Sequence, residues 1–407
     1  MKQMISADEA IKIILENTRI LGREKIFLND ALGRVLAEDI FSPYNIPYAD
    51  NSAMDGYALR ASDTKGASEE NPVKLKIVGI IPAGKVFEGK VNYGEACKIM
   101  TGGIIPEGAD CVARKEICKE KEGFVYVYKE LKVENDLRKS GEDIEKGELV
   151  LKKGTEITPA VIGVLASVGK SVVYVYKRPK ISILISGDEI VDIDEPIGKG
   201  KVKNSNTYSL FALIKESGGI PVNCGIIKDD KNSLKEEIMD NLDSDIILST
   251  GGVSVGDYDY TKEVIEEIGF NIHFWRLKIK PGKPLLFATF RDKLYFGIPG
   301  NPVSTMVVFY KFIMPSILKM QGFKDIFLPQ RRAILVEDIK KKDSRREYIR
   351  GILFEKDSKF FVKSTGPQGS GILKSMVLGN CLIEVKENES KLSKGDEVIV
   401  SIYGKIN

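Results

Sequence analysis

The sharpest candidate for ligand chemistry is a glycine-rich segment at residues 249–261, which reads STGGVSVGDYDYT. It follows an apolar run at 245–248 and precedes a helical pattern, so it joins a strand to a helix. Glycines let a backbone approach a ligand closely, and amides at a helix N-terminus attract an anion. The candidate ligand-binding residues of this segment are Ser249, Gly251, Gly252, Ser254 and Gly256.

Two carboxylates, Asp257 and Asp259, stand near the end of this segment. They would repel a bare phosphate, so they predict a divalent cation that they bind and that accompanies the anion. The alternative is that both aspartates cap the helix that follows.

Two further loops carry residues suited to an oxyanion. In KPGKP (280–284), Lys280 and Lys283 stand on a chain stiffened by prolines, which suits phosphate, sulfate or molybdate. A plain surface turn has the same pattern. In GIPGNPVS (297–304), Pro299 and Asn301 lie in a second strand-to-helix loop, at the edge where doubly wound sheets bind ligands. Here the alternative is that Asn301 only caps the helix.

Other polar segments lack any helical or strand period and are predicted to be loops, where functional residues concentrate. They are DNSAMDGYA (50–58) and IMTGGIIPEGAD (99–110). GEDI (141–144) and SGDE (186–189) each place two carboxylates beside a glycine, which suits Mg²⁺ or a hydroxyl-rich ligand. Paired acids on a solvated turn are the alternative.

Composition excludes several classes of chemistry. His273 is the only histidine, which removes multi-histidine metal sites, and the five cysteines form no CxxC pair. We expect reduced, buried thiols. A net charge of +3 does not indicate a nucleic-acid partner. GIIPAGKV (79–86) fails as a nucleotide-binding P-loop, because Val86 replaces the hydroxyl residue that would bind Mg²⁺.

The elements that must position these residues change in type along the chain. Helical patterns with capping signals begin after Ser6 and after Thr158-Pro159, and β-rich runs at 73–81, 109–117 and 123–131 lie between them. From residue 180 strands and helices alternate, which predicts a doubly wound, mostly parallel α/β sheet whose last helix runs from Pro302 to about Gly322 with a kink at Pro315. After residue 329 only strands are predicted, at 332–336, 348–354, 360–363, 381–385 and 397–402.

The predicted architecture is therefore multidomain α/β. A discontinuous mixed helical domain covers residues 1–43 and 140–177, with a β-rich domain inserted at 44–139. The doubly wound domain covers 178–325 and a C-terminal β-barrel covers 326–407. No membrane span is expected, since the apolar run at 303–320 is interrupted by Ser304, Lys311, Pro315 and Lys319. No signal peptide is evident, so we expect a cytoplasmic protein.

Taken together, these segments resemble the molybdopterin molybdenumtransferases, whose animal relatives form the C-terminal part of gephyrin. The matching pieces run in family order: DNSAMDGYA, IMTGG with PEGAD, GEDI, SGDE, NSN (204–206), STGGVSVGDYDY, KPGKP, GIPGNPVS, and GPQGSGILKSM with GNCLIEV (366–385). They cover nearly the whole chain.

The resemblance implies a homodimer of four-domain subunits whose active cleft combines both subunits. It also implies a reaction in which adenylylated molybdopterin and molybdate give molybdenum cofactor and AMP, with Mg²⁺. The molybdopterin adenylyltransferase is an expected partner. The residues that it implies as catalytic are Asp55, Thr101, Asp143, Glu189 and Asp259; as substrate-binding, it implies Asp229, Lys280, Lys283, Arg350 and Ser375.

Three alternatives stay open from the sequence. A scaffold protein of the gephyrin type could use this fold without its site, although the chain retains Asp259 and Lys283. A nucleotide-dependent transferase could use the doubly wound domain alone. In a tungstate-specific version of the same enzyme, tungstate would contact the same lysines as molybdate.

Overall fold

The computed structural model describes residues 2–251, 260–341 and 343–406. The chain divides into two compact units, which we describe separately. Unit 1 comprises residues 1–26, 33–37 and 174–407, and unit 2 comprises residues 27–32 and 38–173. The four domain boundaries predicted from the sequence stay a prediction.

A mixed sheet organises unit 1. Among the described residues seven strands pair in the order β1-β19-β21-β22-β18-β14-β17, and only β21 runs against the others. Their bounds are β1 Lys2–Ile5, β14 Lys180–Ser186, β17 Ile220–Ile227, β18 Ile246–Thr250, β19 Asn271–Leu277, β21 Leu286–Phe290 and β22 Lys293–Ile298. The expectation of a mostly parallel sheet is confirmed, whereas β1, β19 and β21 were not predicted.

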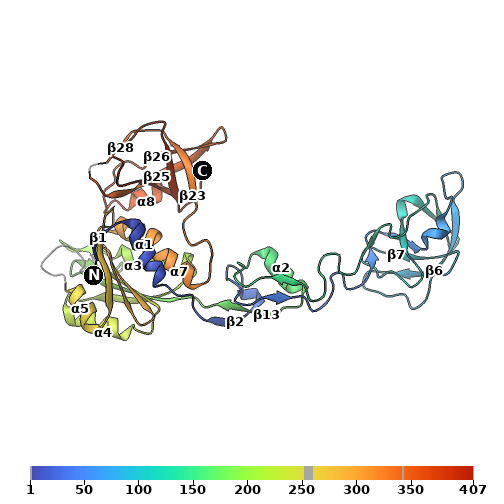
Figure 1. Cartoon of the computed structure of the whole chain (residues 1–407), viewed down its shortest axis with the longest axis horizontal. Helices are drawn as coiled ribbons and strands as arrows, with labels where there is room; N and C mark the ends of the chain where they lie inside the picture. Colours follow the sequence, from blue (N-terminus) through green and yellow to red (C-terminus); the bar gives the residue numbers. More distant parts are fainter. Residues whose placement is uncertain (1, 252–259, 342, 407) are drawn as a thin grey trace. The chain divides into compact units, whose positions relative to one another are not determined.

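Helices cover both faces of this sheet, as expected of a doubly wound fold. They are α1 Ala7–Glu16, α3 Ser205–Glu216, α4 Lys231–Asp240, α5 Thr261–Ile268, α6 Pro302–Val308 and α7 Met314–Met320. Successive residues of β14 point to opposite faces: Ile183 packs into the core with α1, α3 and α7, and Leu184 into the core with α4 and α5. Figure 1 shows α4 and α5 on one side of the sheet and α1 and α7 on the other. This alternation is the period of a strand buried on both faces.

The last helical stretch of the sheet body is continuous but irregular. A π-helical turn, Phe309–Ile313, separates α6 from α7 and ends two residues before Pro315, the position at which the sequence predicted a kink. A proline lacks the amide that the ladder needs, and a π turn accommodates the loss. Pro302–Met320 is long and apolar enough to cross a membrane, but 78% of its apolar window is buried, so it is a helix of the core.

The C-terminal strands of unit 1 close into a barrel. Within the described part of the chain the order β25-β26-β23-β29-β27 returns to β25 through a further pairing. The bounds of the barrel strands are β23 Gln330–Leu335, β25 Arg346–Lys356, β26 Lys359–Ser364, β27 Cys381–Val385 and β29 Glu397–Ile402. The barrel region also contains helix α8 Lys374–Leu378 and a ladder of β24 Ile339–Lys340 with β28 Lys391–Leu392, and the short strand β20 Ile279–Lys280 pairs with β25. The predicted barrel is confirmed.

An ionic cluster joins the barrel to α1 and to the core helix. The Arg346 guanidinium donates to both carboxylate oxygens of Asp8 at 2.7 Å and lies 3.2 Å from Glu384. Lys311, on the π turn, lies 3.6 Å from Glu384 and donates to Ser401 at 3.2 Å. Hydrogen bonds from Arg346 hold the pKa of Asp8 below its usual value, and burial lowers the pKa of Lys311. The cluster therefore links three segments that lie far apart in sequence.

Unit 2 is built around a second sheet. The described strands pair in the order β8-β5-β7-β6-β10-β9. Their bounds are β5 Gly56–Leu59, β6 Val73–Ile81, β7 Glu95–Ile99, β8 Cys111–Arg114, β9 Cys118–Lys121 and β10 Phe124–Val127.

Shorter elements occur in both units. They are β2 Arg23–Phe27, β3 Ile40–Phe41, β4 Asn51–Ser52, β11 Leu137–Arg138, β12 Leu149–Leu151, α2 Pro159–Ser167, β13 Val172–Tyr176, β15 Ile190–Val191 and β16 Val202–Lys203.

The prediction of a loop over residues 50–58 was wrong in part, because Gly56–Leu59 forms an inner strand. A Cβ on Gly56 would lie 2.0 Å from the carbonyl oxygen of Ala113, so only glycine lets the two strands approach. Small residues in a strand carry no β-propensity signal, and this is why the sequence pattern did not show it.

The predicted capping signals are confirmed at both helices. The Ser6 hydroxyl accepts from the Glu9 amide at 3.1 Å, and the Thr158 hydroxyl accepts from the Val161 amide. The Glu9 carboxylate binds Lys2 at 2.6 Å, so the return bond of a capping box is replaced by an ion pair.

Replacing Arg346 with Ala should lower the free energy of unfolding by roughly 3 kcal/mol, since it removes the poorly exposed cation that Asp8, Glu384 and Glu387 share and leaves Glu384 with Lys311 alone. Arg332→Ala is the matched control, because its pair with Glu397 is exposed on the same barrel and should contribute less than about 1 kcal/mol. Urea unfolding followed by circular dichroism measures both. Equal losses would show that the Arg346 cluster does not stabilise the unit.

Candidate functional site

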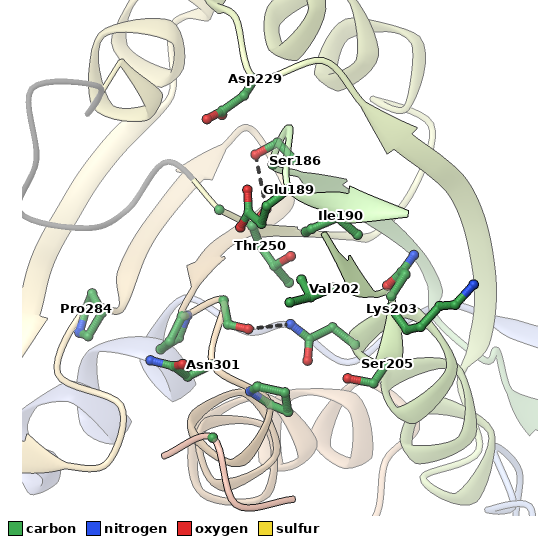
Figure 2. Close-up of a pocket in the computed structure, with 18 residues that line it drawn as sticks. Ser186, Glu189, Ile190, Val202, Lys203, Ser205, Asp229, Thr250, Pro284 and Asn301 are labelled. Carbon is green, nitrogen blue, oxygen red and sulfur yellow. Dashed lines mark hydrogen bonds between the residues drawn. The ribbon is translucent and has the colours of Figure 1, made fainter. Parts of the chain in front are cut away.

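A cavity of about 640 Å³ lies at the carboxyl ends of the parallel strands of unit 1 (Figure 2). Parallel strands bring these ends to one edge of the sheet, where α/β proteins bind ligands. The lining residues follow β14, β17, β18 and β22 or precede α3 and α6, with one residue from the 280–284 loop and one from the barrel segment. They are Ser186, Gly187, Glu189, Ile190, Val202, Lys203, Asn204, Ser205, Asn206, Asp229, Thr250, Gly251, Pro284, Pro299, Gly300, Asn301, Pro302 and Gly371.

The floor of the cavity is the junction of β14 and β18. The Ser186 hydroxyl donates to the Thr250 carbonyl oxygen at 3.2 Å (Figure 2). Gly251 has φ +95°, and a Cβ there would lie 2.3 Å from the Ser186 carbonyl oxygen. The first glycine of the glycine-rich segment is therefore required by close backbone approach.

The loop at 299–302 is fixed from two sides. The Asn206 amide donates to the Gly300 carbonyl oxygen at 2.7 Å, and the Thr305 hydroxyl donates to the Pro299 carbonyl oxygen at 2.6 Å. Asn301 occupies the N-cap position of α6 but makes no capping hydrogen bond through its side chain. The capping alternative is thus wrong for Asn301, whose side chain instead lines the cavity.

Two buried polar atoms in the cavity wall have no protein partner. Among the described residues, neither the side-chain oxygen of Asn206 nor the hydroxyl of Thr250 finds a hydrogen bond. Buried polar atoms are almost always satisfied, and leaving one unpaired costs about 1–3 kcal/mol. Both residues line the cavity, so a polar ligand would satisfy them.

The carboxylates of the cavity are Glu189 and Asp229, both candidates from the sequence. The Tyr260 hydroxyl donates to Asp229 Oδ1. Burial, with this carboxylate, raises the pKa of Tyr260, so the phenol stays protonated and remains a donor.

The lysines of KPGKP differ in their surroundings. Lys280 pairs with Glu347 of the barrel at 2.9 Å. For Lys283, no ion pair is found within the described ranges, and the next residue, Pro284, lines the cavity. Of these two lysines, only Lys280 therefore has its charge compensated by a described residue.

Arg350 and Ser375 are brought together by the fold. The Arg350 side chain is 1% exposed and donates to the Ser375 hydroxyl and to the Gly369 carbonyl oxygen, each at 3.0 Å. Burial lowers its pKa, although a guanidinium stays charged. No carboxylate pairs with it in the part of the chain that the structure describes. A buried cation without a counter-charge favours an anion nearby.

The candidates of unit 2 fall into two groups. Asp55 Oδ1 accepts from the Thr101 amide at 2.8 Å and from its hydroxyl at 2.9 Å, and these bonds lower the pKa of Asp55. Asp143 lines a separate depression of about 390 Å³ with Arg138 and Glu142. Asp55 and Thr101 thus share one contact, and Asp143 belongs to another surface of the same unit.

The structure describes only part of the glycine-rich segment. Gly252, Ser254, Gly256, Asp257 and Asp259 lie outside the described residues. Ser249 is described, and its hydroxyl hydrogen-bonds with that of Tyr295 in the core, since the strand turns its side chain away from the cavity.

The sequence reasoning missed Asn204, Ser205, Asn206 and Thr250 as lining residues. NSN was noted only as a matching motif. Its position between a strand and α3 was a usable signal, because helix N-termini at the strand ends of such sheets face the ligand.

Thr250→Val should leave the free energy of unfolding unchanged or raise it by about 1 kcal/mol, because it removes an unpaired buried hydroxyl at almost constant shape. Thr305→Val is the control: its hydroxyl is buried and bonded, so the variant should lose about 1–2 kcal/mol. Urea unfolding measures both. A comparable loss in Thr250→Val would mean that its hydroxyl is satisfied within the protein.

Comparison with known proteins agrees with this geometry. Residues 5–169 match the model of the MoeA N-terminal region (domain I and II), residues 182–319 a probable molybdopterin binding domain, and residues 332–403 the MoeA C-terminal region (domain IV). The chain is 34% identical to the molybdopterin molybdenumtransferase of Haemophilus influenzae over 98% of this chain and 99% of that one. It is 36% identical to the Nostoc enzyme of the same name, over 91% and 86%.

A solved structure gives the same result at the level of the fold. The molybdopterin biosynthesis moeA protein of Pyrococcus horikoshii matches with a TM-score of 0.83 and 33% identity, covering 98% of this chain and 100% of that one. Full-length similarity at this identity defines a family. The chain belongs to the molybdopterin molybdenumtransferase family.

Proposed function

We propose that this protein inserts molybdate into adenylylated molybdopterin and releases AMP, which completes the molybdenum cofactor. The observation that carries the proposal is the cavity of unit 1, whose buried Asn206 oxygen and Thr250 hydroxyl find no partner among the described residues. A volume of about 640 Å³ lies within the range of small-molecule sites. A ligand rich in hydroxyl, amide and phosphate groups would pair both atoms.

The oxyanion would bind where the protein leaves positive charge uncompensated. Among the described residues, no carboxylate pairs with the buried Arg350, whose guanidinium donates to the Ser375 hydroxyl at 3.0 Å. Lys283, for which no ion pair is found among the same residues, directly precedes Pro284 of the cavity wall. Guanidinium and ammonium groups bind tetrahedral oxyanions through charge-assisted hydrogen bonds. Lys280 would act with them, with its orientation set by Glu347.

Cleavage of the phosphoanhydride calls for stabilisation of developing phosphate charge and for positioning rather than for a covalent nucleophile. Among the described residues, no three acidic, histidine or cysteine side chains converge on a metal site. Glu189 and Asp229 supply hard oxygen donors in the cavity, and Asp257 and Asp259 remain the predicted metal ligands. Magnesium, when bound there, would neutralise phosphate charge.

The remaining assignments stay predictions from the family. Asp55, Thr101 and Asp143 are proposed to act as catalytic residues, and the hydrogen bonds between Asp55 and Thr101 support a carboxylate that is ionised and held in one orientation. The molybdopterin adenylyltransferase as a partner and the cytoplasmic location also stay predictions.

The native protein, incubated with adenylylated molybdopterin, Mg²⁺ and molybdate, should release AMP and form active cofactor, and should do neither without Mg²⁺.

Lys283→Ala should raise the molybdate concentration at half-maximal rate about tenfold, as expected for a lost charge-assisted hydrogen bond. Lys278→Ala is the control, since Lys278 is exposed and precedes the loop. A native protein that releases no AMP refutes the function, and equal behaviour of the two variants refutes the lysine's role.

We further propose a homodimer, as the family resemblance implies. Light scattering at micromolar protein should give twice the subunit mass of 45.2 kDa. A fully active monomer would remove the shared cleft from the proposal.

A further inference from the structure

Asp229 follows β17 directly and lines the cavity, on the side opposite Asn301 and Ser205 in the view of Figure 2. The Tyr260 hydroxyl donates to its Oδ1 atom. Tyr260 stands at the N-cap position of α5, and its ring packs against the core beneath α4 and α5. A side chain anchored in the core therefore holds a carboxylate of the cavity wall.

The neighbouring Asp230 shows how the two carboxylates divide their roles. Asp230 caps α4: its Oδ1 accepts from the Asn232 and Ser233 amides at 3.0 and 2.9 Å, and its Oδ2 accepts from the Ser233 hydroxyl at 2.7 Å. Both Asp230 oxygens thus serve the helix. Of the Asp229 oxygens, only Oδ1 is engaged by a described residue.

We propose that Tyr260 is a positioning residue, which fixes Asp229 through Oδ1 so that Oδ2 accepts hydrogen bonds from hydroxyl or amino groups of the organic substrate. The inference rests on the proposed function, since it concerns the same cavity. Fixing one oxygen removes the rotational freedom of the carboxylate before the ligand binds, which strengthens binding without new contacts. Tyr260 itself does not line the cavity and acts only through Asp229.

A matched pair elsewhere in the same unit provides the control. The Tyr208 hydroxyl donates to Asp192 Oδ1 at 2.9 Å, and Asp192 does not line the cavity. Tyr208→Phe therefore removes the same kind of hydrogen bond as Tyr260→Phe, without reaching an assigned ligand-binding residue.

The test measures AMP release at varied substrate concentrations. Tyr260→Phe should raise the KM for adenylylated molybdopterin about tenfold, as expected when a hydrogen bond to a charged group is lost. The turnover number and the KM for molybdate should stay within about twofold of the native values. Tyr208→Phe should change none of the three. A merely structural role for Tyr260 would instead lower turnover or affect both substrates.

A double-variant comparison isolates the coupling. In an Asp229→Ala background, Tyr260→Phe should add no further rise in KM, because the residues act as a unit. The inference is overturned if the effects of the two substitutions on KM are additive, or if Tyr260→Phe has the same KM as Tyr208→Phe. In either case, AMP release by the native protein leaves the proposed function standing. If native protein releases no AMP, the function itself fails.

If the melting temperature of Tyr260→Phe is far below that of Tyr208→Phe, Asp229→Glu replaces Tyr260→Phe in the test. This variant shifts the carboxylate by one methylene relative to the Tyr260 hydroxyl and leaves the tyrosine ring in place. The same selective rise in KM for the adenylylated substrate supports the inference, and an unchanged KM overturns it.

Discussion

The parallel pairing of β14 with β18 is the constraint on which the candidate site depends. It sets Ile185 opposite Thr250, so that Ser186 and Gly251 meet at the carboxyl end of the pair. The approach is too close for any side chain on Gly251. β14 and β18 both end at this edge of the sheet, which is where β17 and β22 also end and where polar side chains collect.

Around this junction, the fold uses some polar groups and leaves others free for a ligand. Asn206 illustrates the division within one side chain, because its amide nitrogen holds the 299–302 loop whereas its oxygen stays unpaired. Both carboxylate oxygens of Asp230 accept hydrogen bonds at the N-terminus of α4, whereas only one carboxylate oxygen of the adjacent Asp229 accepts a hydrogen bond from a described residue. A site built in this way is rigid before the ligand arrives, so less conformational entropy is lost on binding.

The barrel contributes to the same unit through charge as well as apolar packing. Along β25, Arg346, Tyr348 and Arg350 share a face, since side chains of a strand alternate. Arg346 pairs with carboxylates on α1 and β27, whereas the described partners of the Arg350 guanidinium are a hydroxyl and a carbonyl oxygen. One strand thus carries a compensated cation that fixes the barrel to α1 and an uncompensated cation suited to an oxyanion.

The sequence by itself determined the element types, the helix caps at Ser6 and Thr158, the doubly wound body, the barrel and the family, because periodicity, capping and motif order are local properties of the chain. It could not show that Ser249 turns into the core, that Asn301 does not cap α6, or that Gly56 lies in an inner strand. These depend on which strands become neighbours, and strand neighbours are chosen by contacts between residues far apart in sequence. For the same reason, only the tertiary structure revealed that Tyr260 holds Asp229 and that Arg350 is buried with no carboxylate partner among the described residues.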